Sequence, residues 1–115
     1  MAINSKRKGK RGELEFCQEM KKYGIDCRRT VQYNGKADEG EADIVGLEGI
    51  HAEVKRVERL NIHEAMEQAE RDTKGKMPAV FHRKNRSKWL VTMKLSDFMK
   101  IYQSYEKERA KEWDK

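Results

Sequence analysis

Residues 42–56, with the sequence ADIVGLEGIHAEVKR, decide the fold expected for this chain. A short apolar run over 42–47 is separated by the dipeptide Glu-Gly from a second run over 50–57, which extends one residue past this stretch. Runs of this length around a glycine-containing pair are typical of two β-strands joined by a tight turn. The stretch therefore predicts a β-hairpin, and the rest of the domain is expected to be built around it.

The second strand of this hairpin has one apolar face and one charged face. Side chains alternate along a strand, so Ala52 and Val54 supply an apolar face while Glu53 and Lys55 point the other way. The tight turn is expected to bring Asp43 of the first strand close to Glu53. Two carboxylates near a backbone carbonyl suit Mg²⁺ or Mn²⁺, and a neighbouring lysine can activate water or stabilise charge on a phosphate. A surface ion pair across the hairpin is the alternative interpretation.

Helices and strands are expected on both sides of the hairpin. Helical periodicity predicts a helix over 12–23 that ends at Gly24, and a second helix capped by Asn61. The further expected elements are a strand over 25–33, strands over 79–82 and 89–93, and a last helix over 96–105. The order αβββαββα predicts one small α/β domain with a mixed β-sheet flanked by helices. We expect a basic arm over 1–11, the domain over 12–105 and a charged, frayed tail over 106–115.

Each predicted helix carries an apolar stripe. The stripe residues are Glu13, Phe16, Cys17 and Met20 in the first helix, Ile62, Ala65, Met66 and Ala69 in the second, and Phe98, Ile101, Tyr102 and Tyr105 in the last. The last stripe is interpreted as core or as a dimer surface, and Trp89 as core. Glu13 is unusual on such a face, where an unpaired carboxylate is costly. A metal or a metal-held water would explain its position, and a salt bridge to an arginine is the alternative; Glu15 falls on the polar face.

Composition limits the class of protein. The chain has 115 residues, enough for one domain, and its 26 Lys and Arg against 20 Asp and Glu give a net charge of +6, which favours a polyanionic partner. Apolar runs approaching the roughly 18 residues of a membrane span do not occur, so a membrane protein is not expected. Two cysteines, Cys17 and Cys27, are too few for a disulfide scaffold or a zinc site, which indicates a reducing, cytoplasmic setting.

Basic residues gather in two clusters around an acidic interval. We expect these clusters to contact the phosphates of a nucleic acid. The candidate DNA-binding residues are Lys6, Arg7, Lys8, Lys10 and Arg11 at the N-terminus, Arg83, Lys84 and Arg86 before the fifth strand, and Arg71 on the second helix.

Four motifs give the chain a resemblance to a known superfamily. They are RKGKRGE at 7–13, EADIVG at 41–46, HAEVKR at 51–56 and EQAER at 67–71. An Asp followed about ten residues later by Glu-x-Lys resembles the PD-(D/E)xK nucleases, and within them the archaeal-type Holliday-junction resolvases and the short resolvase-like endonucleases of phages. Ala42 replaces the proline of the superfamily's name, a residue that shapes the strand and binds no metal.

This resemblance implies a restriction-endonuclease-like fold and a set of site residues. The catalytic set is Glu13, Asp43, Glu53, Lys55 and Gln68. The metal ligands are Asp43, Glu53, the carbonyl of Val54 and Glu13, holding Mg²⁺ for which Mn²⁺ can substitute. His51 is a weaker candidate for a general base, since the sequence pairs it with no nucleophile. No small-molecule cofactor is expected.

The resemblance also implies a substrate and an assembly. It predicts a homodimeric endonuclease that cuts branched DNA such as a four-way junction, in the cytoplasm of a bacterial host and encoded by a phage or prophage. Two alternatives stay open at this point. One is a nuclease for flaps, nicks or single strands, and the other is a non-catalytic basic DNA-binding module.

Overall fold

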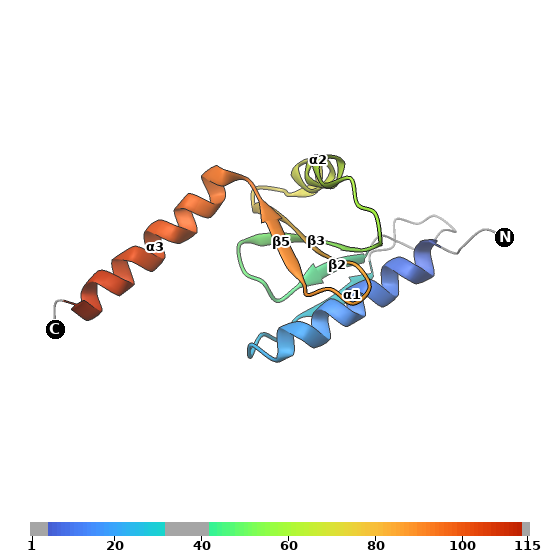
Figure 1. Ribbon diagram of the computed structural model, residues 1–115, viewed down its shortest axis with the longest axis horizontal. Helices are drawn as coiled ribbons and strands as arrows, with labels where there is room; N and C mark the ends of the chain where they lie inside the picture. Colours follow the sequence, from blue (N-terminus) through green and yellow to red (C-terminus); the bar gives the residue numbers. More distant parts are fainter. Residues whose placement is uncertain (1–4, 32–41, 114–115) are drawn as a thin grey trace.

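The computed structural model describes residues 5–31 and 42–113 (Figure 1). Within these ranges the elements follow the predicted order. They are α1 (Ser5–Lys21), β1 (Arg28–Val31), β2 (Ala42–Val45), β3 (Ile50–Arg56), α2 (Ile62–Asp72), β4 (Met77–Arg83), β5 (Leu90–Met93) and α3 (Leu95–Trp113).

The described strands form two sheets. β3, β4 and β5 make a mixed sheet in which β3 runs parallel to β4 and β4 antiparallel to β5, and β1 pairs antiparallel with β2. Figure 1 shows α1 and α2 on opposite sides of β3. A helix on each side of a mixed sheet confirms the predicted α/β class and is consistent with a restriction-endonuclease-like fold.

The core lies on both faces of the mixed sheet. On the α1 side, Phe16 is fully buried and its ring packs against Phe81 of β4 and against Trp89, confirming Trp89 as core. On the α2 side, a second cluster contains the buried residues Ala65, Ala69 and Val80. The predicted stripes of the first two helices are therefore the packed faces.

Local signals place the ends of these two helices. The Asn61 side chain accepts a hydrogen bond from the Glu64 amide at 3.1 Å, the N-cap interaction that the sequence predicts. After α1, Gly24 has a φ of +77°, its amide donates to the Lys21 carbonyl, and the Ile25 amide donates to the Met20 carbonyl. This pair of bonds is a Schellman motif, which needs the left-handed conformation that glycine adopts at little cost.

The predicted hairpin between 42–47 and 50–57 is wrong. Among the described strands, β2 pairs with β1 and β3 pairs with β4, so β2 and β3 belong to different sheets. Gly46 explains the difference, because its backbone lies directly against Asp26 and Cys27, the residues that precede β1. A side chain at this position would block the approach, so Gly46 allows β2 to pair with β1, while the amide of Met77 donates to the carbonyl of Gly49 and begins the β3–β4 pairing.

Replacing Gly46 by alanine is expected to destabilise the protein by about 2 kcal/mol or more. Gly46 has a φ of +118°, and an added Cβ would lie 2.8 Å from the Cα of Cys27, too close for two carbons. Gly49→Ala is the matched control, because Gly49 also has a positive φ, +80°, but an added Cβ there meets no atom within 4 Å. Urea unfolding of both variants measures the difference; equal losses of stability would show that the contact with Cys27 is unimportant.

Two helices are longer than expected. α1 begins at Ser5, inside the predicted arm, because the lysines and arginines of that segment are good helix formers. α3 continues to Trp113, which contradicts the expected fraying after residue 105; the ion pairs Glu106–Arg109 and Glu108–Lys111 lie along its last turns. No helix in the described ranges is long and apolar enough to cross a membrane.

The apolar face of α3 lies on the surface. Figure 1 shows this helix extending away from the sheet. Phe98, Tyr102 and Tyr105 are 47%, 42% and 59% exposed, although their rings contact one another along the helix. Of the two interpretations of this stripe, core and dimer surface, the structure excludes core.

Candidate active site

Strand β3 carries the charged residues of the site on one face. His51, Glu53 and Lys55 alternate with Ala52 and Val54, which pack on the α1 side of the sheet. The Nζ atom of Lys55 lies 3.6 Å from Oε1 of Glu53, and Nε2 of His51 lies 3.7 Å from Oε2. The two oxygens of Glu53 therefore face two different partners, and the predicted division of this strand into an apolar and a charged face is confirmed.

Helix α2 supplies a polar residue to the same site. The Nζ atom of Lys55 donates a hydrogen bond to Oε1 of Gln68 at 3.2 Å. Gln68 is half-buried beside the buried Ala65 and Ala69, on the helix face that packs against the sheet. The structure thus brings together Glu53, Lys55 and Gln68, three of the predicted catalytic residues.

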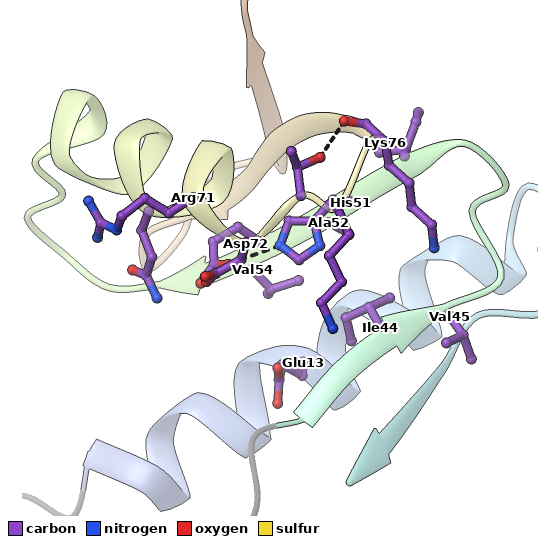
Figure 2. Close-up of a pocket in the computed structure, with 14 residues that line it drawn as sticks. Glu13, Ile44, Val45, His51, Ala52, Val54, Arg71, Asp72 and Lys76 are labelled. Atoms are coloured by element: carbon purple, nitrogen blue, oxygen red, sulfur yellow. Dashed lines mark hydrogen bonds and ion pairs between the residues drawn. The ribbon is translucent and has the colours of Figure 1, made fainter. Parts of the chain in front are cut away.

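Glu53 and Gln68 border a cavity of about 440 Å³ (Figure 2). Its walls come from α1, β2, β3 and the end of α2, and the charged residues that line it are Glu13, His51, Glu53, Arg71, Asp72, Lys74 and Lys76. A cavity with carboxylates at its wall and cations around them can hold a divalent ion beside a phosphate.

Asp72, His51 and Glu53 form a compact group of possible metal ligands. One ligand atom from each lies within 4.8 Å of the other two. Asp72 is not among the predicted site residues, and His51 was predicted only as a weaker candidate for a general base. A signal was present, because Asp72 follows Gln68 by four residues and so lies on the same side of α2.

Burial raises the pKa of the Glu53 carboxyl above its ordinary value, although the charges of Lys55 and His51 act in the opposite direction. The native state therefore keeps this proton over a pH range in which the unfolded chain has lost it. The contribution of Glu53 to stability is greatest below the pKa that its carboxyl has in the unfolded chain. It falls as the pH rises through the higher pKa of the folded protein. At neutral pH the Glu53 carboxylate consequently reduces the stability of the metal-free protein.

Glu53→Gln is expected to raise the melting temperature of the metal-free protein at neutral pH by a few degrees. The gain should shrink below the ordinary pKa of a glutamate, about pH 4, where the wild-type side chain is protonated as well. Thermal unfolding followed by circular dichroism at both pH values measures this difference. The exposed Glu67→Gln on α2 is the control, and a lower melting temperature for Glu53→Gln at neutral pH would contradict the expectation.

The other two side chains predicted as metal ligands are those of Asp43 and Glu13. Asp43 lies in β2, where its backbone pairs with that of Thr30, and its side chain is outside the described part of the structure. Oε1 of Glu13 accepts a hydrogen bond from Nε of Arg29 at 2.6 Å, so the salt bridge considered for Glu13 is present. Glu13 nevertheless lines the cavity, and Figure 2 shows it on α1, apart from His51 and Asp72.

Glu15 has a structural role that the sequence analysis missed. It was expected on the polar face, but its side chain is only 29% exposed and pairs with Arg56 and Arg83. These contacts connect α1 to the ends of β3 and β4. Neither arginine is close to Glu15 in sequence, so helical periodicity alone could not reveal the pairing.

The predicted DNA-binding residues divide into three groups. Lys10, Arg11, Arg71, Lys84 and Arg86 are exposed. Arg83 is half-buried in its ion pair with Glu15, and the side chains of Lys6, Arg7 and Lys8 lie outside the description. Lys74 and Lys76, which the sequence analysis did not select, are exposed at the cavity.

The fold and this site define a class of protein. A mixed sheet between helices, with Glu-x-Lys on a strand beside a carboxylate-lined cavity, is the arrangement of a PD-(D/E)xK nuclease. In a comparison with protein families, residues 4–114 match the family described as phage putative PDDEXK endonuclease, and the chain belongs to this family. Its membership makes it a nuclease by class. Comparisons with curated proteins and with solved structures gave no match.

Proposed function

We propose that the protein is a divalent-metal-dependent endonuclease that cleaves branched DNA, with four-way junctions as its preferred substrate. The observation that carries this proposal is the contact series Glu53–Lys55–Gln68, in which Lys55 contacts two residues of the cavity wall, Glu53 and Gln68. The family supports a nuclease, while the preference for junctions rests on the resemblance to the resolvases.

The residues of the site fit a divalent metal. They offer carboxylates from Glu53 and Asp72, and the Nε2 atom of His51 is a buried polar atom without a hydrogen-bond partner in the described structure. In the proposed site Asp43 and Glu53 hold Mg²⁺, for which Mn²⁺ can substitute, with help from the Val54 carbonyl and Glu13. When bound, the ion supplies positive charge that stabilises the phosphate as it is attacked.

Lys55 has the central role in the proposed chemistry. Its ammonium group lies close to Glu53 of β3 and donates a hydrogen bond to Gln68 of α2, so residues of two elements restrain its position. There it orients the attacking water and balances the charge that develops on the phosphodiester. Gln68 acts as a positioning residue, because its side-chain oxygen holds the Lys55 amine.

The surroundings of the cavity support a nucleic-acid substrate. Arg71, Lys74 and Lys76 are exposed at its wall, and Lys84 and Arg86 are exposed in the connection between β4 and β5. Exposed cations of this kind bind phosphates without reading sequence. This property suits an enzyme that recognises the shape of a junction.

We further propose that the enzyme is a homodimer formed through α3, and that it acts in the cytoplasm of a bacterial host of the phage. A stable interface buries about 800 Å² on each partner. The exposed stripe of Phe98, Tyr102 and Tyr105, extended by Leu95 and Ile101, gives α3 an apolar face along several turns. Two copies joined by this face would present two sites to the two strands that a junction resolvase cuts.

The dimer is tested by sedimentation velocity on the full chain. Phe98→Glu places a charge in the centre of the exposed stripe and is expected to convert dimers to monomers. Lys100→Glu on the same helix is the control, since Lys100 is exposed and outside the stripe. Identical sedimentation of the Phe98→Glu variant and the wild-type protein would refute an α3 interface.

The function is tested by incubating the purified protein with labelled four-way junction, flap, nicked duplex, linear duplex and single strand, each with Mg²⁺, Mn²⁺ or a chelator. Metal-dependent cutting of the junction ahead of linear DNA is expected. Equal cutting of all duplexes, or a preference for flaps, nicks or single strands, would retain the nuclease and overturn the junction preference. Binding without cutting under every metal condition would instead identify a non-catalytic DNA-binding module.

A further inference from the structure

A second set of metal ligands lies on the side of Glu53 that faces away from Lys55. Lys55 approaches Oε1 of Glu53, whereas His51 approaches Oε2. Asp72 reaches the same place from the end of α2. Figure 2 shows the His51 ring directed toward Asp72.

The Nε2 atom of His51 is the strongest indication of a ligand. It is buried and has no hydrogen-bond partner in the described structure, and its 3.7 Å separation from Oε2 of Glu53 exceeds hydrogen-bond length. A buried polar atom without a partner costs free energy, so most such atoms in proteins are satisfied. A cation between the imidazole and the carboxylates would provide the missing partner.

The spacing of the three side chains fits one ion. Ligands held about 2.1 Å from an octahedral ion lie roughly 3 to 4.2 Å apart. The His51–Glu53 separation of 3.7 Å lies inside this range, and all three ligand atoms lie within 4.8 Å of one another. Asp72 is exposed, so its side chain is free to rotate toward an ion bound by His51 and Glu53.

The chemistry of the donors distinguishes between metals. Mg²⁺ binds oxygen ligands and keeps much of its water, whereas imidazole nitrogen is a ligand typical of transition-metal ions. Mn²⁺ accepts carboxylates as readily as Mg²⁺ does and lies at the start of the transition-metal series. One imidazole with two carboxylates therefore favours Mn²⁺ over Mg²⁺.

We propose that His51, Glu53 and Asp72 bind a divalent transition-metal ion and that His51 makes the site select Mn²⁺ over Mg²⁺. The use of this ion in DNA cleavage rests on the nuclease function proposed above, but its binding does not. The site shares Glu53 with the ligands expected from the superfamily and adds two residues that the superfamily motif does not include.

The proposal is tested on the full chain without DNA. Isothermal titration calorimetry with Mn²⁺ and with Mg²⁺ gives the ratio of the two affinities, and pulsed electron paramagnetic resonance of bound Mn²⁺ detects a coordinated imidazole nitrogen. The wild-type protein is expected to bind Mn²⁺ more tightly and to show the nitrogen signal. His51→Ala should weaken Mn²⁺ binding by about tenfold to a hundredfold, reduce the preference over Mg²⁺ and abolish the signal.

Two matched variants control for the substitution itself. His63→Ala removes an exposed histidine of α2 and should leave the nitrogen signal and both affinities unchanged. Asp72→Asn should weaken the binding of both metals, whereas Glu70→Gln, an exposed carboxylate two residues earlier, should not. Because Asp72 is exposed, its replacement tests the site even if His51→Ala fails to fold.

Two results would overturn the proposal. One is an unchanged Mn²⁺ to Mg²⁺ affinity ratio in folded His51→Ala, and the other is a nitrogen signal that persists in that variant or is missing from the wild-type protein. If the nuclease proposal fails instead, the protein will not cleave DNA, but its metal binding will still depend on His51 and Asp72.

Discussion

Replacing Lys55 by alanine is expected to lower the rate of DNA cleavage by about 10²- to 10⁴-fold, while DNA affinity stays close to that of the unchanged protein. Lys55 is the cation nearest Glu53 on its Oε1 side and is held there by Gln68, so its loss removes a group placed at the reacting phosphate. Binding depends on exposed cations outside this contact series, whereas Lys55 is half-buried and already paired with Glu53 and Gln68.

Single-turnover cleavage of a labelled junction, with binding measured separately, tests this expectation. Lys84→Ala is the matched control, because Lys84 is exposed in the β4–β5 connection and away from Glu53. The control should weaken binding and reduce its salt dependence without changing the rate of the bound complex. Gln68→Leu, which removes the hydrogen bond to Lys55, should cause a smaller loss of rate than Lys55→Ala. A Lys55→Ala enzyme that cuts at the wild-type rate would refute the assigned role.

Phe16→Ala is expected to reduce the free energy of unfolding by about 3–5 kcal/mol. Phe16 is fully buried, and its ring centre lies 4.7 Å from that of Phe81 and 5.6 Å from that of Trp89. It therefore connects α1 to the mixed sheet, and alanine leaves a cavity that these large neighbours cannot readily fill. Such a loss is a large fraction of the stability of a domain of this size.

Urea denaturation followed by circular dichroism measures the effect of Phe16→Ala. Leu14→Ala is the control on the same helix, since Leu14 is 47% exposed and its replacement removes less buried surface. Equal free energies of unfolding for the two variants would contradict the central position of Phe16 in the core.

Features set by neighbouring residues were predictable from the sequence. The cap at Asn61 and the end of α1 near Gly24 depend on hydrogen bonds within a few residues. The alternation of β3, which places Glu53 and Lys55 on one face, depends only on the geometry of a strand. These local rules also explain why the order of elements was predicted correctly.

Features that join distant residues were not predictable in the same way. A glycine-containing turn indicated a hairpin, but the contact of Gly46 with Asp26 and Cys27 gave β2 a different partner. Glu15 appeared to be a solvent-facing residue because Arg56 and Arg83, which pair with it, are distant in sequence. The spacing of Asp72 from Gln68 places both on one side of α2, but the proximity of Asp72 to His51 arises only when α2 packs on the sheet.

The two faces of β3 determine which mutations in this strand the protein tolerates. Ala52 and Val54 pack in the core on the α1 side, while His51, Glu53 and Lys55 lie together on the opposite face. Deleting one residue within this strand exchanges the two sets, which buries charges and exposes apolar groups. Single-residue deletions or insertions in β3 should therefore yield unfolded protein, whereas substitutions at Lys55 can yield protein that is inactive and folded.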